Sequence, residues 1–323
     1  MQAKGNVHMH AKIQLIRRWM NIALGKSAVA VEQGVGKCYS RDRIRGYYND
    51  LTGKVSPATL LDDEGIPVNI TSSGARVYSL VTIMQYALGC FDLYLMEDDA
   101  KYKDTFLRLS DFILRNQEDG GKWDARASIG SSQDNSSCMA QGQGCSIMLR
   151  AHGLTGDLRY LQAAERAVAF MLLPCDQGGT AVYTGEDITL EKYPPQGGRA
   201  SSVLNGWIFA LFGLYDYLLA TGSAVQYRRL WEQSCRTLES HLSQYDRAYW
   251  SDYDLLGTIA SPAYHSVHIA LLKALADLSG SKVMFAYAER FERYRRSRVR
   301  RLRAVAVKLA QKLTRPSDSF FVQ

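Results

Sequence analysis

The chain has 323 residues, of which 46% are apolar and 22% charged, a globular balance that allows one large domain or two ordinary ones. Its six cysteines are scattered, with no CxxC pair and no His/Cys cluster at ligand spacing, so neither a zinc site nor a disulfide framework is indicated. The net charge of +7 is local, because eleven Lys/Arg stand against one acid between Arg290 and Arg315. The remainder is slightly acidic, about −3, which argues against a nucleic-acid-binding face.

The first region, residues 1–76, contains a short basic helix predicted from Lys12 to Leu24 and then an irregular arm. Between Lys37 and Val68 the pattern is typical of an extended segment or a β-hairpin. The apolar run Trp19–Leu24 is too short for a signal peptide, and no apolar run is long enough to cross a bilayer. We therefore expect a cytoplasmic protein without a membrane span, and the arm leaves a homodimer open.

From residue 77 to 288 the sequence repeats. Polar turns at positions 98, 156, 222 and 280 lie 58, 66 and 58 residues apart, and each separates an apolar helix from a more charged, amphipathic one. The pattern predicts four helical hairpins whose apolar first helices run from Tyr78 to Met96, Ser137 to Leu154, Ser202 to Ala220 and Pro262 to Leu278. An inner ring of apolar helices inside an amphipathic outer ring is an α/α toroid, with a helical solenoid as the alternative.

The segments that enter the apolar helices contain the unusual residues of this sequence. In a toroid these segments open at one end of the ring, where aromatic faces and amides provide what a sugar-binding site needs. The candidates are Tyr78, Trp123, Gln141, Gln143, Glu191, Lys192, Tyr193, Asn205, Tyr253, Tyr264, His265 and His268. His265 and His268 have no further ligands at a suitable spacing, so no metal is expected. No dinucleotide loop, P-loop or GxSxG motif is present, and no cofactor is indicated.

Six motifs in this region resemble the C-terminal region of the D-glucuronyl C5-epimerase family, which converts glucuronate to iduronate units in heparosan-type chains. They cover roughly residues 60–285 in the right order. The motifs are Gln85-Tyr86-Ala87-Leu88-Gly89, Met139-Ala140-Gln141-Gly142-Gln143, Tyr193-Pro194 with Val203-Leu204-Asn205-Gly206, Gly213-Leu214-Tyr215-Asp216, Tyr253-Asp254-Leu255, and Tyr264-His265 with His268-Ile269. The family's fold is an α/α toroid behind β-rich parts.

The resemblance implies an isomerase that needs no cofactor and acts on an acidic uronate polysaccharide. Such an enzyme removes the C5 proton on one face of the sugar, returns a proton on the other and stabilises charge on the carboxylate. The family pattern places Tyr193, Tyr253 and Tyr264 at the reaction centre, with a carboxylate beside the Tyr-Pro pair, and adds Gln85 to the substrate-binding candidates.

This sequence departs from the animal pattern at two positions. Lys192 stands where Glu precedes Tyr-Pro, and Leu256 stands where Arg follows Tyr-Asp-Leu. Either Glu191 takes over the carboxylate's role, or Lys192 acts as the base or neutralises the substrate carboxylate. Arg199 is a candidate replacement for the missing guanidinium.

The last region, residues 289–323, belongs to a basic amphipathic helix predicted from Tyr287 to Leu313. Val299, Leu302, Ala306, Leu309 and Leu313 share one stripe of this helix. Its arginines form either a solvated face on a packed helix or a surface attracted to an anionic membrane or an acidic polysaccharide.

Two other functions stay open at this stage. A polysaccharide lyase abstracts the same C5 proton and then expels the C4 substituent. A non-catalytic glycan-binding or assembly protein would also keep the aromatic residues, and the departures at Lys192 and Leu256 favour that alternative.

Overall fold

The structure is a computed structural model that describes residues 31–70, 74–125, 135–195, 197–222 and 225–314. The helix expected between Lys12 and Leu24 lies outside the described residues, as does the end of the basic tail.

The described chain is mainly α-helical, and its helices form four consecutive hairpins. They pair α2 (Leu80–Glu97) with α3 (Ala100–Arg115), α4 (Cys138–Thr155) with α5 (Leu158–Leu172), α6 (Leu204–Thr221) with α7 (Val225–His241), and α8 (Pro262–Ser279) with α9 (Lys282–Arg296). The four apolar helices begin and end within about two residues of the predicted bounds. The predicted repeat is therefore confirmed.

The hairpin turns explain why the repeat could be located from sequence. Asp98, Gly156, Gly222 and Gly280 end the four inner helices in the left-handed conformation, with φ between 53° and 73°. The Asp157 side chain then caps α5 by accepting a hydrogen bond from the backbone N–H of Arg159. These are short-range effects that residue type alone decides.

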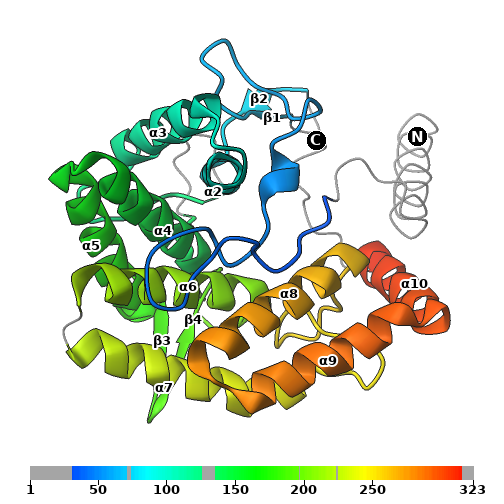
Figure 1. Ribbon diagram of the computed structural model, residues 1–323. Helices are drawn as coiled ribbons and strands as arrows, with labels where there is room; N and C mark the ends of the chain where they lie inside the picture. Colours follow the sequence, from blue (N-terminus) through cyan, green and yellow to red (C-terminus); the bar gives the residue numbers. More distant parts are fainter. Residues whose placement is uncertain (1–30, 71–73, 126–134, 196, 223–224, 315–323) are drawn as a thin grey trace, which may run out of the picture.

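The inner helices α2, α4, α6 and α8 pack on one another in chain order, and the outer helices cover them (Figure 1). Close packing of α4 on α6 depends on glycine, because a Cβ on Gly213 would lie 2.3 Å from the backbone oxygen of Gly142.

Residues 39–48 of the N-terminal arm contact all four inner helices. The backbone N–H of Tyr47 donates to Asp92 of α2 and the Tyr39 hydroxyl to Asp277 of α8. Arg150 of α4 donates to the backbone oxygens of Arg45 and Gly46. One short segment can reach four helices only if their C-terminal ends converge. The hairpins therefore curve into an α/α toroid rather than a straight solenoid (Figure 1).

A buried ion pair stands where the arm meets the ring. Arg150 Nη1 of α4 is 2.6 Å from Asp216 Oδ2 of α6, and both side chains are fully buried. The Tyr48 hydroxyl donates to the other oxygen of Asp216 at 2.7 Å. Because a buried charge without its partner costs about 3–5 kcal/mol, this network fixes the arm against the end of the ring formed by the C-termini of the inner helices.

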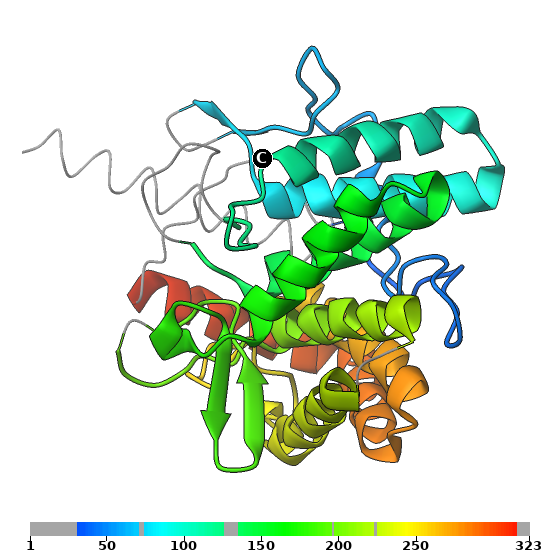
Figure 2. The same ribbon diagram turned by 90° about the vertical axis from the view of Figure 1, so that its left-hand side faces the viewer.

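Strands are few and short among the described residues. β1 (Asn69–Ile70) pairs with β2 (Arg76–Val77), just after the range 37–68 in which an extended segment or a β-hairpin was predicted. Residues 37–68 themselves contain the short 3-10 helix η1 (Thr52–Lys54) and isolated bridges, so the predicted hairpin is not formed there. The hairpin of β3 (Ala181–Thr184) and β4 (Asp187–Leu190), between α5 and α6, was not predicted. It lies against α7, and Figure 2 shows it projecting at the edge of the ring.

The single C-terminal helix predicted from Tyr287 to Leu313 is wrong in one respect. The chain forms two helices, α9 and α10 (Arg298–Thr314), separated at Ser297, which has an extended ψ of 114°. The Ser297 hydroxyl accepts a hydrogen bond from the backbone N–H of Arg300, so serine starts the second helix.

Candidate active site

The segment between β4 and α6 is fixed by the carboxylate of Glu191. Glu191 is fully buried, and its oxygens accept hydrogen bonds from the Ser202 backbone N–H at 2.8 Å, the Ser202 hydroxyl at 2.9 Å and the Thr189 hydroxyl at 2.9 Å. Its backbone oxygen accepts from the N–H of Cys138 at the start of α4. The carboxylate therefore ties this segment to Ser202 and Thr189, and its catalytic role stays a prediction.

Lys192 is the next residue, and its side chain points to a group of phenols. Its Nζ donates a 2.9 Å hydrogen bond to the Tyr253 hydroxyl and lies 5.5 Å from the ring centres of Tyr193 and Tyr253 and 5.9 Å from that of Tyr264. The rings of Tyr253 and Tyr264 are 4.9 Å apart. The structure thus brings together four predicted site residues, which we call the Lys192 cluster: Lys192, Tyr193, Tyr253 and Tyr264.

The stem of Lys192 has room because of one glycine. A Cβ on Gly206 of α6 would lie 2.6 Å from the Cβ of Lys192 and 3.0 Å from its Cδ. Tyr193 and Tyr264 are 36% and 40% exposed, so the cluster has an open side from which a substrate could approach.

The electrostatics of the cluster favour a charged lysine and a neutral Tyr253 phenol. Burial acts to lower the pKa of Lys192, but the phenolic oxygens of Tyr193, Tyr253 and Tyr264 favour the ammonium, and the net effect raises the pKa well above its usual value. Burial raises the pKa of Tyr253 well above 10, although the neighbouring ammonium of Lys192 opposes the increase. The cluster therefore presents one cation surrounded by phenols near neutral pH.

Two histidines of α8 lie beside the cluster and share one serine. The Ser251 hydroxyl is 2.8 Å from Nδ1 of His265 and 3.0 Å from Nδ1 of His268. His265 Nε2 faces the Phe291 carbonyl at 3.0 Å, so this nitrogen donates and Nδ1 accepts. The Ser251 hydroxyl therefore donates its hydrogen bond to Nδ1 of His265, and Nδ1 of His268 donates a hydrogen bond to the Ser251 oxygen. This leaves Nε2 of His268 as an acceptor.

Both imidazoles are neutral at physiological pH. Burial lowers the pKa of His265 to about 3, and burial together with His265 and Lys192 lowers the pKa of His268 well below its usual value. Nε2 of His268 is buried and makes no hydrogen bond within the described residues. His268 is thus neutral and held near the cluster by the serine that it shares with His265.

The predicted amides divide into two groups. Gln141 is fully buried, accepts from the backbone N–H of Trp123 and donates to its carbonyl, and the Trp123 indole donates to Ile113. Gln141 and Trp123 therefore fix the chain to α4. Gln143 of α4 and Asn205 of α6 are also buried, but both amide atoms of Gln143 and the Asn205 oxygen have no partner within the described residues.

The remaining predicted residues make no contact that links them to Lys192 in the described part of the chain. The Tyr78 hydroxyl donates to Asp62 at 2.6 Å in the N-terminal region. Gln85 is half-buried on α2, and Arg199 is exposed in the loop before α6. Leu256, at the position of the missing arginine, is 48% exposed.

Family comparison places these residues in a known context. The family model described as D-glucuronyl C5-epimerase C-terminus matches residues 117–293, more than half of the chain. The chain belongs to this family. The resemblance read from the six motifs is thereby confirmed. All four members of the Lys192 cluster fall inside the matched segment of this epimerase-family chain, whereas α10 lies beyond it.

A D-glucuronyl C5-epimerase of Caenorhabditis elegans is 29% identical to this family member over 219 residues, which are 60% of this chain and 35% of that protein. An uncharacterised protein of Methanocaldococcus jannaschii is 27% identical over 145 residues, 44% of this chain and 46% of that protein. The chain thus spans less than half the length of these curated relatives.

Two solved structures show a more distant likeness. The unsaturated glucuronyl hydrolase of Bacillus sp. GL1 has a TM-score of 0.46 at 15% identity, over 67% of this chain and 60% of that chain. A polysaccharide lyase has a TM-score of 0.43 at 13% identity, over 76% of this chain and 35% of that chain.

Sequence reasoning missed two residues that hold the candidate site of this family member together. Ser202 supplies two of the hydrogen bonds that hold Glu191, and Ser251 orders both histidines. Neither serine has a neighbour in sequence that marks it. Within the described part of the chain, no three His, Cys, Asp or Glu side chains group as metal ligands, and no helix combines the length and apolar character of a bilayer span.

Proposed function

We propose that this chain is a uronosyl C5-epimerase that converts D-glucuronate to L-iduronate units in an acidic polysaccharide. The observation that carries the proposal is the Lys192 cluster, in which one ammonium lies 5.5 to 5.9 Å from the centres of three tyrosine rings. Membership of the epimerase family supports the reaction type. Heparosan is the first substrate to test.

Removal of the C5 proton leaves an electron pair that moves onto the carboxylate, so the enzyme must offset a second negative charge there. We assign this task to the Lys192 ammonium. Tyr253, whose oxygen already contacts Nζ, takes the C5 proton as its phenolate. Tyr264 returns a proton to C5 from the opposite face, and the C5 configuration inverts. No other bond of the sugar breaks, which distinguishes the reaction from β-elimination.

Incubation with heparosan in deuterated water tests the proposal directly. We expect deuterium at C5 of the uronate and new iduronate signals in the NMR spectrum. An ultraviolet-absorbing unsaturated uronate would instead identify a lyase. Binding of several uronate polymers without isotope exchange would overturn catalysis and leave a glycan-binding protein.

We also propose that α10 places this enzyme at the inner face of an anionic membrane in the cytoplasm. The predicted apolar stripe faces outward, with Val299, Leu302 and Leu313 exposed by 77%, 64% and 43%. Arg298 and Arg303 on the same helix are exposed as well. An exposed apolar stripe beside arginines suits a lipid surface, because a polyanion in solution would leave the apolar groups in water.

Vesicle sedimentation tests this surface. The protein should sediment with mixed phosphatidylglycerol and phosphatidylcholine vesicles in low salt, and Leu302→Glu should weaken sedimentation. Val225→Glu is the matched control, since Val225 is 84% exposed on α7, at the start of a different helix. Equal sedimentation of both variants would refute the surface. A homodimer stays a prediction, to be checked by light scattering.

A further inference from the structure

Tyr253 lies on a short hairpin, residues 252–259, that enters α8. The first side of the hairpin pairs with the second through an antiparallel bridge between Asp252 and Ile259 and through the Tyr253 backbone N–H, which donates to the Thr258 carbonyl at 2.6 Å. The Tyr253 carbonyl accepts from the N–H of Leu204 at the start of α6. The position of the Tyr253 phenol therefore depends on what holds this hairpin.

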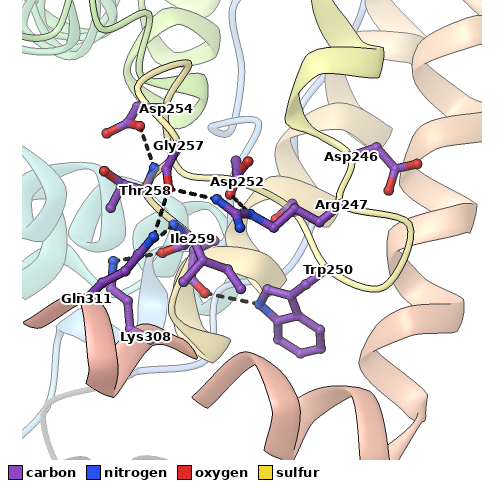
Figure 3. A network of polar contacts seen from close by, with 12 residues as sticks. Asp246, Arg247, Trp250, Asp252, Asp254, Gly257, Thr258, Ile259, Lys308 and Gln311 are labelled. Carbon is purple, nitrogen blue, oxygen red and sulfur yellow. Dashed lines mark hydrogen bonds and ion pairs between the residues drawn. The ribbon is translucent and has the colours of Figure 1, made fainter. Parts of the chain in front are cut away.

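Helix α10 holds the second side of the hairpin (Figure 3). Lys308 Nζ donates to the Ile259 carbonyl at 2.7 Å. Gln311, one turn later, accepts from the Ile259 backbone N–H at 3.0 Å and donates to the Gly257 carbonyl at 2.8 Å. Two side chains of α10 thus satisfy both backbone groups of one hairpin residue and the carbonyl of another.

Arg247 also holds the hairpin, through contacts that do not involve α10. It donates to the Gly257 carbonyl at 2.7 Å and forms an ion pair with Asp252, the residue before Tyr253 (Figure 3). The Gly257 carbonyl therefore accepts from both Arg247 and Gln311. Without the α10 contacts, Arg247 would remain as the side chain that holds Gly257 on the second side of the hairpin. The hairpin, and Tyr253 with it, would then be free to shift relative to Lys192.

The hydrogen bond from Lys308 to Ile259 requires the burial of an ammonium group, which costs free energy. This cost indicates that the contact serves a specific role. Lys308 is only 8% exposed. Burial and the neighbouring Lys312 lower its pKa to about 8, against the opposing influence of Asp254 and Asp252. Below that pH the ammonium makes a charge-assisted hydrogen bond, which is roughly twice as strong as a neutral one. A leucine or methionine would cover the same surface without desolvating a charge.

We propose that Lys308 and Gln311 are positioning residues that set Tyr253 against Lys192, so that α10, which lies outside the matched family segment, is part of the working active site. The catalytic consequence depends on the function proposed above, whereas the geometric one does not. A displacement of about 1 Å in a reacting group can reduce a rate by about 100-fold. We expect Lys308→Met and Gln311→Leu to lower kcat by at least about tenfold with little change in KM.

The first readout is independent of activity. In protein with ¹³C at the tyrosine ζ carbon, the Tyr253 signal, assigned with Tyr253→Phe, reports its contact with Lys192. Lys308→Met and Gln311→Leu should shift that signal. The matched controls Lys282→Met and Gln226→Leu replace exposed residues of the same types on other helices and should leave the signal unchanged.

The outcomes separate the two proposals. If the Tyr253 signal does not move in Lys308→Met or Gln311→Leu, the positioning role is wrong whatever the activity. If the signal moves but the unaltered enzyme shows no C5 exchange, the epimerase proposal fails and the positioning role stands. If Lys308→Met does not fold, Gln311→Leu decides, because it buries no charge. Lys308→Arg should restore both the signal and kcat in part, since it keeps a cation that can donate to Ile259.

Discussion

Replacement of Lys192 by methionine removes the ammonium that lies among the three phenols. An ammonium about 4 Å from the carboxylate that gains charge contributes about 4 kcal/mol at an effective dielectric constant of about 20. Through the rate equation this corresponds to about 1,000-fold in kcat. Loss of one preorganised donor in other enzymes costs about 100- to 1,000-fold, which agrees with the electrostatic figure. We therefore expect Lys192→Met to lower the rate of C5 exchange by about 100- to 1,000-fold.

The assay is deuterium incorporation at C5 of heparosan, followed by NMR at saturating polymer so that kcat is measured. The melting temperature is measured on the same samples. It shows whether the fold persists, since methionine removes the hydrogen bond to Tyr253 but keeps an apolar stem against Gly206. Lys192→Arg keeps the charge but changes its position. Its exchange rate should therefore lie between those of the unaltered enzyme and Lys192→Met.

Two results would refute this reasoning. An exchange rate in Lys192→Met within about threefold of the unaltered enzyme would show that the ammonium does not stabilise the transition state. A rise in KM with unchanged kcat would show that Lys192 only binds the substrate carboxylate in the ground state.

Four further predictions follow from the contacts and pKa shifts. Glu191→Gln should lower the free energy of unfolding by about 2 kcal/mol in urea titrations. The new amide NH2 group would face the N–H and hydroxyl of Ser202, which now donate to the carboxylate. If Glu191→Gln keeps its stability but loses activity, Glu191 takes part in the reaction itself. Gly206→Ala should lower kcat at least about tenfold while the fold persists, since the new Cβ displaces Lys192; an active variant would show that the stem has other room. The pKa of Tyr253 lies well above 10, so its phenolate fraction grows throughout the accessible range. The exchange rate should therefore rise about tenfold per pH unit from about pH 6 to about pH 9, whereas a plateau near neutrality would point to a histidine as the base. Burial raises the pKa of Asp92 from 3.8 to about 7. The stability that its protonated form provides is present below about pH 4 and lost as pH rises through about 7, up to about 4 kcal/mol, so Asp92→Asn should flatten this part of the stability profile in denaturant titrations.

The sequence determined the helical hairpins and their period, because the forces involved act over a few residues. A glycine such as Gly156 ends a helix in the left-handed conformation, and Asp157 caps the next one wherever the pair occurs. The family motifs likewise identified three of the phenols that meet at Lys192. The break at Ser297 was missed, because the periodic pattern of apolar residues continues through it.

Only the tertiary structure decided between neighbouring residues. Glu191 and Lys192 are adjacent just after β4, yet the Glu191 carboxylate accepts from Ser202 whereas the Lys192 ammonium contacts Tyr253. Which of the two enters the active site depends on Ser202, 11 residues after Glu191, and on Tyr253, 61 residues after Lys192.

The same reason applies to α10. Its periodicity showed an apolar stripe but not which face would be covered. The structure covers the face of Ala304 and Lys308 and leaves Val299 and Leu302 in solvent, because the hairpin that contains Tyr253 presents backbone carbonyls that a lysine and a glutamine can satisfy. Local pattern thus determined the elements of this protein, whereas contacts between distant segments decided which side chains meet.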